Sequence, residues 1–152
     1  MTCYELQLTP QPAGLPEEVP ARVLIVDDDD AQTEILAMRL GRLGFRTLTA
    51  ASGASGLRQA RQERPDLVVL DVRLPDADGM EICEQLTDDP ATCMIPVIIL
   101  TGMERPDIVR CARQAGCRFF VRKPYDPNAL LLLIQSALRQ GQEWAGDEAP
   151  PC

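Results

Sequence analysis

The chain has 152 residues, of which 45% are hydrophobic and 25% are charged, and this composition suits one globular domain. Its longest apolar run, 129–134, is far shorter than the roughly 18 residues that a membrane-spanning helix needs. The formal net charge is −8, with −3 in each of the segments 1–20 and 141–152, so the remainder is nearly balanced, and we expect no basic patch and no direct nucleic-acid binding. The sequence contains no histidine, which excludes Ser-His-Asp and Cys-His catalytic units and histidine metal ligands.

The two ends of the chain differ in composition from its middle. Residues 1–20 contain four prolines and little apolar periodicity, and residues 141–152 end in Ala-Pro-Pro-Cys. We expect a disordered N-terminal tail over 1–20, a folded domain over 21–140, and a second tail or the start of a linker over 141–152. The N-terminus lacks the basic and apolar segments of a secretory signal, and we therefore expect a cytoplasmic protein.

The first half of the domain alternates short apolar runs with helical patterns. Residues 23–26 predict a buried strand, and 31–43 predict a helix with Asp30 as its N-cap and Gly44 at its end. A second strand is expected over 47–50. A second helix is expected over 55–63, before Pro65.

The second half continues the same alternation. The very apolar run 67–70 predicts a central strand, followed by a loop and a helix, and 97–100 predicts the next strand. Pro106 suits the first turn of a further helix, and a strand over 118–122 and a helix over 127–139 complete the pattern. Leu132 falls opposite the apolar stripe of that last helix. The loop contains Pro75, Asp76, Asp78 and Gly79, and the helix after it is built on Met80, Ile82, Cys83 and Leu86.

Five strand-helix repeats predict an α/β fold, a (βα)5 doubly wound sheet of five parallel strands. Sheets of this class place their sites beyond the carboxyl ends of the strands. The sequence therefore predicts that the polar residues after the first, third, fourth and fifth strands share one crevice. These residues are Asp27 and Asp28, Asp71, Thr101 and Gly102, and Lys123 and Pro124.

Three carboxylates in one crevice need a counter-charge, because each pair at 4 Å repels by roughly 4 kcal/mol at an effective dielectric constant of about 20. Lys123 supplies one positive charge, and a divalent cation would neutralise the rest. An all-oxygen ligand set favours Mg²⁺ or Mn²⁺. Each residue by itself also has an ordinary structural explanation, such as a helix start or a strand end. Only their combination points to a site.

These segments resemble the receiver domain of two-component response regulators, a family with a flavodoxin-like fold. The matching motifs are Leu-Ile-Val followed by Asp27-Asp28-Asp29, Val-Val-Leu-Asp71 with Pro75 and Gly79 after it, Ile-Ile-Leu-Thr101-Gly102, and Val-Arg-Lys123-Pro124. The resemblance covers about residues 21–140.

The resemblance implies a role for each residue. Asp71 would accept a phosphoryl group from a histidine kinase or a histidine phosphotransfer protein. Asp28 would bind Mg²⁺ directly, Asp27 would bind it through water, and the carbonyl of Arg73 would join Asp71 as a further ligand. Thr101 and Lys123 would bind phosphoryl oxygens, and Thr101 would act with Phe120 as the conformational switch. The peptide bond before Pro124 would be cis.

The resemblance also implies a signalling domain that is not an enzyme beyond its own phosphoryl transfer and autodephosphorylation. No output domain follows residue 140, so the output would be a downstream protein, a receiver homodimer, or a domain outside this sequence. We considered a phosphatase of the haloacid dehalogenase class, but its second carboxylate two positions after the nucleophile is missing, because Arg73 stands there. Two alternatives stay open: a binding module that has lost phosphorylation, and a receiver that is one part of a hybrid kinase or a multidomain regulator.

Overall fold

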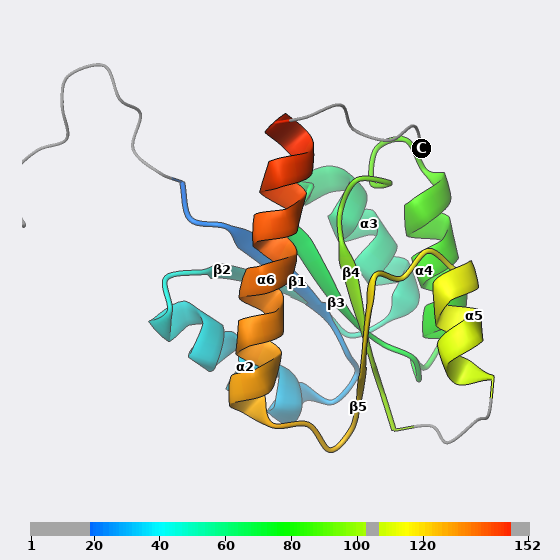
Figure 1. Ribbon diagram of the computed structural model, residues 1–152. Coiled ribbons are helices and arrows are strands. Elements are labelled where there is room, and N and C mark those ends of the chain that lie inside the picture. Colours follow the sequence, from blue (N-terminus) through cyan, green and yellow to red (C-terminus); the bar gives the residue numbers. More distant parts are fainter. Residues whose placement is uncertain (1–18, 103–106, 147–152) are drawn as a thin grey trace, which may run out of the picture.

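The computed structural model describes residues 19–102 and 107–146, and for 141–146 it describes the backbone alone. Figure 1 shows a single sheet with helices on both sides. The strands are β1 (Arg22–Val26), β2 (Arg46–Ala50), β3 (Leu67–Asp71), β4 (Val97–Thr101) and β5 (Phe119–Arg122). The helices are α2 (Asp30–Arg42), α3 (Gly53–Glu63), α4 (Gly79–Asp88), α5 (Ile108–Gln114) and α6 (Pro127–Gly146).

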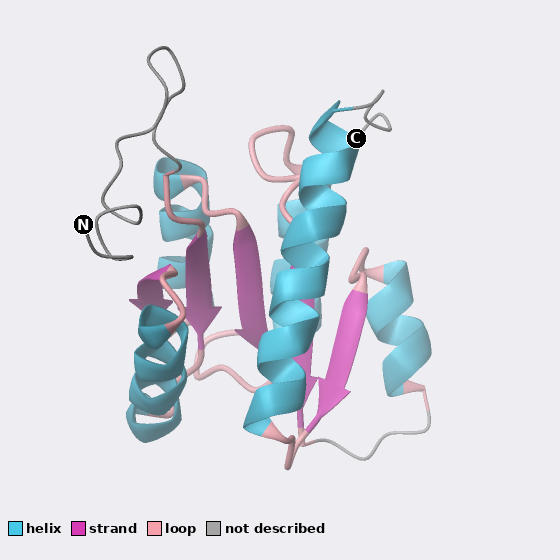
Figure 2. Ribbon diagram, turned by 60° about the vertical axis from the view of Figure 1, so that its left-hand side comes forward, coloured by secondary structure: helices cyan, strands magenta, loops and turns pink. Residues whose placement is uncertain are grey.

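All neighbouring strands are parallel, in the order β2-β1-β3-β4-β5. The predicted (βα)5 doubly wound fold is therefore confirmed, with β3 in the centre as expected. Figure 2 shows that the strand arrowheads all point toward the same edge of the sheet. That carboxyl edge carries the residues that the sequence analysis singled out.

Two apolar layers hold the helices on the sheet, because successive strand residues face opposite sides. On β1, Val23 and Ile25 pack with α2 and α6, whereas Leu24 and Val26 pack with α3, α4 and α5. The strands β3 and β4 are buried along their whole length. The sheet is thus covered on both faces, and its polar groups are confined to the strand ends. None of the described helices is long and apolar enough to cross a membrane.

Several element ends differ from the sequence-based expectations. The N-cap of α2 is Asp29, not Asp30, because the Asp29 carboxylate accepts the N–H of Gln32 and Asp30 already belongs to the helix. Helix α3 begins at Gly53, two residues earlier than expected, because Ser52 caps it through the N–H of Ser55. Strand β5 begins at Phe119, one residue later than expected.

The last helix shows the largest difference. Helix α6 continues past the expected end at Arg139 to Gly146. Residues 140–145 contain neither proline nor an adjacent glycine pair. The apolar stripe on which the expectation rests shows which face of a helix is buried, and it does not mark the residue at which the helix ends. The domain limit at residue 140 stays a prediction. Residues 1–18, Pro106 and residues 147–152 lie outside the described residues.

Candidate phosphoacceptor and metal site

Asp27, Asp28 and Asp71 meet at the carboxyl edge of the sheet, as predicted. Asp71 is the last residue of β3, and Asp27 and Asp28 directly follow β1, its neighbour in the sheet. One carboxylate oxygen from each lies within 4.8 Å of the others. Asp27 and Asp71 are 6% and 8% exposed, whereas Asp28 is exposed to solvent. The cluster therefore has two buried carboxylates and one that solvent reaches.

Lys123 supplies the positive charge that the sequence analysis expected. Its Nζ lies 3.5 Å from Oδ2 of Asp27 and 3.5 Å from Oδ2 of Asp71. The backbone N–H of Lys123 donates to the carbonyl of Thr101 at 2.7 Å, which fixes the lysine at the end of β4. The peptide bond between Lys123 and Pro124 is cis, as expected.

The electrostatics of the site follow from burial and from these neighbours. Burial raises the pKa of Asp71, Lys123 lowers it, and Asp27 raises it again, so the net pKa lies above that of an ordinary aspartate. Burial by itself lowers the pKa of Lys123, but the carboxylates of Asp71 and Asp27 outweigh that effect and raise it. The lysine is therefore a permanent cation at neutral pH.

Backbone groups hold the carboxylates in place. Oδ1 of Asp27 accepts the N–H of Asp29 at 3.0 Å, and Oδ1 of Asp71 accepts the N–H of Arg73 at 3.4 Å. The start of α4 lies against β3, because a Cβ on Gly79 would be 2.3 Å from the carbonyl oxygen of Asp71. Only glycine fits there, which explains a residue that the sequence analysis assigned to a loop.

The two residues expected to switch also lie close to this edge. Thr101 is buried at the end of β4, and Phe120 is half-buried on β5. The register pairs Phe120 with Ile99, two residues before Thr101, so Thr101 and Phe120 occupy the same face of neighbouring strands. A Cβ on Gly102 would meet only the Cβ of Lys123, at 4.0 Å, so space is open beside the lysine.

The donor set fits a hard divalent cation. Mg²⁺ takes oxygen ligands at about 2.0–2.1 Å, so two of its ligands are at most about 4.2 Å apart, close to the spacing of the three carboxylates. The described part of the chain offers no histidine here, and no cysteine belongs to the cluster. The residues present therefore suit Mg²⁺ or Mn²⁺.

Comparison with known proteins identifies one family. The family model of the response regulator receiver domain matches residues 23–135. The chain is 39% identical over 127 residues to the transcriptional regulatory protein AfsQ1 of Streptomyces coelicolor, covering 84% of this chain and 55% of that protein. It is 37% identical to the protein PilH of Pseudomonas aeruginosa, covering 78% of this chain and 98% of that protein.

Solved structures give the same result. A putative response regulator from Chloroflexus aurantiacus matches with a TM-score of 0.75 and 32% identity, covering 80% of this chain and 99% of that one. A CheY-like receiver domain protein from Methanospirillum hungatei matches with a TM-score of 0.78 and 28% identity, covering 82% and 98%. The chain spans about half the length of AfsQ1 and nearly all of PilH.

Proposed function

The chain belongs to the response regulator receiver domain family, a family of signalling domains, and from that premise we propose that Asp71 accepts a phosphoryl group from a histidine kinase or a histidine phosphotransfer protein. One observation carries the proposal. The buried carboxylate of Asp71 lies between two further carboxylates and the ammonium of Lys123, at the carboxyl edge of the sheet.

The chemistry needs neutralisation of charge more than it needs an acid or a base. An oxygen of Asp71 forms a bond to phosphorus while the bond from phosphorus to the donor's histidine nitrogen breaks, and the nitrogen takes up a proton. The ammonium of Lys123 stabilises the transferring oxygens, and the hydroxyl of Thr101 donates to one of them. Bound Mg²⁺ or Mn²⁺ supplies the remaining positive charge.

The proposed metal ligands are those that the resemblance to receiver domains implies. As the family resemblance implies, the exposed Asp28 would bind the ion directly, while the buried Asp27 would bind it through water. Asp71 and the carbonyl of Arg73 complete the protein ligands. Autodephosphorylation would be the only other reaction of the site, and a cytoplasmic location stays a prediction.

Phosphorylation would shift an equilibrium between two conformations through Thr101 and Phe120. Thr101 would follow the phosphoryl oxygens and leave space that the Phe120 ring occupies. The ring cannot donate a hydrogen bond, so this coupling would work by packing alone. NMR spectra of the Phe120 ring before and after phosphorylation measure the shift, and an unchanged ring environment would contradict it.

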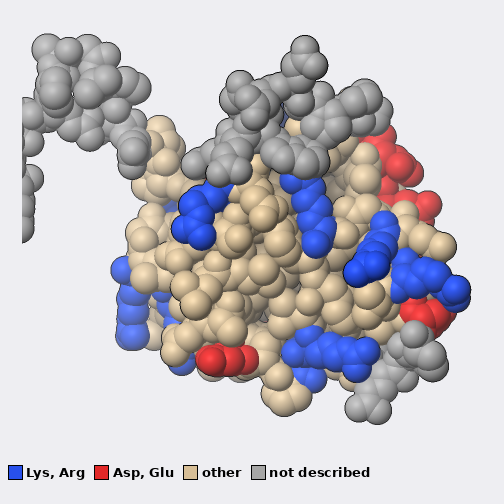
Figure 3. Space-filling model, viewed as in Figure 1, with Lys and Arg blue, Asp and Glu red and all other residues tan. Residues whose placement is uncertain are grey.

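The output surface would lie around α5, β5 and α6. A groove there is lined by Val109, Arg113, Phe120 and Leu133 among others, and Leu132 is 66% exposed nearby on α6. The segment 107–122 contains four arginines and one acidic residue, and two of these arginines, Arg113 and Arg118, line the groove. Figure 3 shows basic side chains spread over this side of the molecule and few acidic ones. A downstream protein or a second receiver with apolar and acidic side chains would fit it.

Leu132→Glu should leave phosphorylation of Asp71 intact and weaken phosphorylation-dependent association, because burying one leucine is worth roughly 1.5–3 kcal/mol. Leu43→Glu, at an exposed leucine beyond α2, is the matched control. Sedimentation velocity on the phosphorylated proteins measures self-association. Monomeric behaviour of the wild type would leave only a partner of another kind.

The central proposal is tested with a small-molecule phosphodonor, Mg²⁺ and intact mass spectrometry. The wild type should gain the mass of one phosphoryl group, and Asp71→Asn should gain none, because an amide oxygen is a poor nucleophile. Arg139→Ala, on α6 and outside the acidic cluster, serves as a control that should be phosphorylated normally. Incorporation into the Asp71→Asn protein would reject the assignment.

A further inference from the structure

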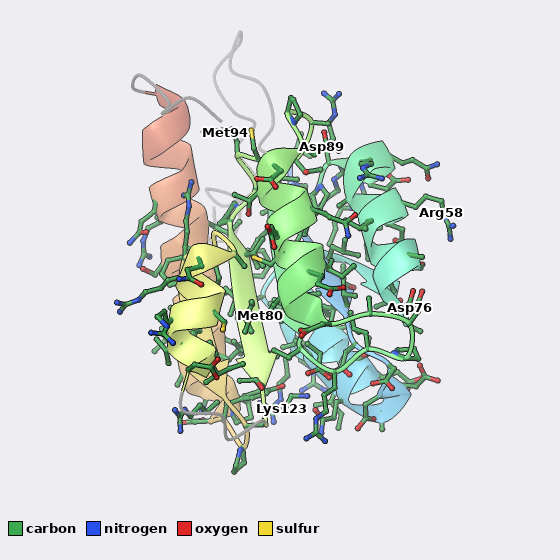
Figure 4. All side chains as sticks on the ribbon, turned by 90° about the vertical axis from the view of Figure 1, so that its right-hand side faces the viewer. Arg58, Asp76, Met80, Asp89, Met94 and Lys123 are labelled. Carbon is green, nitrogen blue, oxygen red and sulfur yellow. The ribbon has the colours of Figure 1, made fainter. Side chains whose placement is uncertain are left out.

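The loop between β3 and α4, residues 72–78, is attached to a helix that is distant in sequence. Oδ1 of Asp76 accepts the N–H of Gly53 at 2.7 Å, and Oδ2 accepts the N–H of Ala54 at 3.0 Å. Figure 4 shows Asp76 in this loop, at the end of the molecule that also carries Lys123. The carboxylate thus binds the first two amides of α3 at once.

Helix α3 does not need Asp76 as its only cap. Ser52 lies at the N-cap and accepts the N–H of Ser55 at 3.2 Å, which is the local arrangement that a helix start requires. The hydrogen bonds from Ala54 and Gly53 hold the pKa of Asp76 below its usual range, so it is an anion at neutral pH. Asp76 therefore adds a tie between loop and helix to a cap that already exists.

The start of α3 is itself fixed against the site. A Cβ on Gly56 would lie 2.9 Å from Cγ2 of Val26, so the helix rests directly on the residue before Asp27. A Cβ on Gly53 would lie 2.8 Å from Cδ1 of Ile82 and 3.2 Å from Cβ of Ala77. The first turn of α3 is thus packed between β1 on one side and the loop with its following helix on the other.

The same loop carries the expected backbone ligand. Arg73 follows Asp71 by two positions, donates its N–H to that carboxylate, and pairs with Asp78 across the loop in an isolated antiparallel bridge. Arg73 follows β3 in the chain, whereas Asp27 and Asp28 follow β1. The distance between these two sets of ligands depends on how the loop is held relative to β1.

We propose that Asp76 is a positioning residue for the metal site, which ties the β3–α4 loop to α3 and so fixes the Arg73 carbonyl relative to Asp27 and Asp28. The proposal rests on the function proposed above. Asp76 touches neither the metal nor the phosphoryl group, and it acts through the loop. Partners that orient metal ligands commonly change metal affinity by tenfold or more when they are removed.

The test compares two caps of the same helix. Asp76→Ala removes the tie to the loop, and Ser52→Ala removes the local cap without touching the loop. Calorimetric titration of each folded protein with Mg²⁺ should give a Kd about tenfold above wild type for Asp76→Ala and a Kd within about twofold for Ser52→Ala. Asp76→Asn keeps one oxygen acceptor and should give an intermediate Kd.

The outcomes separate the two proposals. Mg²⁺ binding by the Asp76→Ala protein with wild-type affinity would overturn the positioning role, and so would an equal loss in Ser52→Ala, because that result would assign the effect to the helix start. If Asp76→Ala does not fold, wild-type affinity in Asp76→Asn overturns the role instead. Absence of Mg²⁺ binding by the wild type would reject the proposed function together with this role.

Discussion

The two edges of the sheet differ in how their charged side chains are paired. At the carboxyl edge, Asp27, Asp28 and Asp71 share a single ammonium, which lies 3.5 Å from two of them. At the amino edge, the guanidinium of Arg22 pairs with the carboxylate of Glu63 at 3.3 Å and also donates to the carbonyl oxygens of Glu63 and Arg64. The backbone N–H of Arg22 donates to Asp66 at 2.7 Å.

At the amino edge, the guanidinium of Arg22 finds its partners within the protein. It lies at the C-terminal end of α3, where the helix dipole favours a cation. The carboxyl edge keeps a surplus of negative charge that the protein does not neutralise. A surplus of this kind lowers stability, and a bound cation would relieve it. The residues of the amino edge thus stabilise the fold, whereas those of the carboxyl edge are the ones to which we assign the chemistry.

The largest expected effect concerns the carboxyl edge. With the proposed ligand set, Asp28→Ala should weaken Mg²⁺ binding about tenfold or more, because the ion would lose a direct ligand. Asp27→Ala should weaken it less, because its contact would run through water. Titration calorimetry on the two variants measures the difference. Equal losses would show that the exposure of the two carboxylates does not determine their roles.

A smaller effect is expected on stability at the same edge. The pKa of Asp71 is raised in the folded state, chiefly by burial, so the unfolded chain releases this proton at a lower pH, and stability falls as the pH rises through that window. Asp71→Asn removes the cost of burying an ionised carboxylate. In EDTA, which keeps the protein free of metal, it should increase the free energy of unfolding at pH 7 by on the order of 1 kcal/mol.

Urea unfolding at several pH values tests this sign. The gain from Asp71→Asn should shrink as the pH is lowered and disappear well below about pH 3.9, the pKa of an aspartate in the unfolded chain, because the wild-type carboxyl is then protonated in both states. A variant that is less stable than wild type at pH 7 would mean that the pairing with Lys123 outweighs burial. In that case the two edges would not differ as described.

The smallest effect is expected at the amino edge. Arg22→Ala should lower the free energy of unfolding by roughly 0.5 kcal/mol, because its side chain and that of Glu63 are 32% and 48% exposed and solvent screens the pair. The variant should bind Mg²⁺ as the wild type does. Urea unfolding measures the stability, and titration calorimetry measures the Mg²⁺ affinity. Weaker Mg²⁺ binding by the variant would show that a change at the amino edge reaches the carboxyl edge.

The sequence was sufficient for the sheet because each strand is a short apolar run between helical patterns. It also located Asp27, Asp71 and Lys123 in one crevice, since parallel strands bring their carboxyl ends to the same edge. Contacts that depend on distant packing were not predictable. The tie from Asp76 to α3 joins residues 22 and 23 positions apart, and no local pattern indicates it.

Errors at the ends of elements have a similar origin. Asp29 and Asp30 are both acceptable N-caps, and only the hydrogen bond to Gln32 decides between them. The end of α6 was placed by the apolar stripe, which reports where a helix packs and not where it stops. Glycine at position 79 is explained by the Asp71 carbonyl beside it, a contact that exists only in the folded chain.

The ammonium group of the site belongs to Lys123, which directly follows the last strand, and this position has a consequence for folding. Lys123 is separated from Asp27 by 96 positions, so the pair forms only after a very long loop has closed. Contacts of such high sequence separation form late and slowly in folding. A chain in which β5 has not yet docked has its carboxylates without their ammonium, so competence for phosphorylation would report that β1, β3, β4 and β5 have assembled.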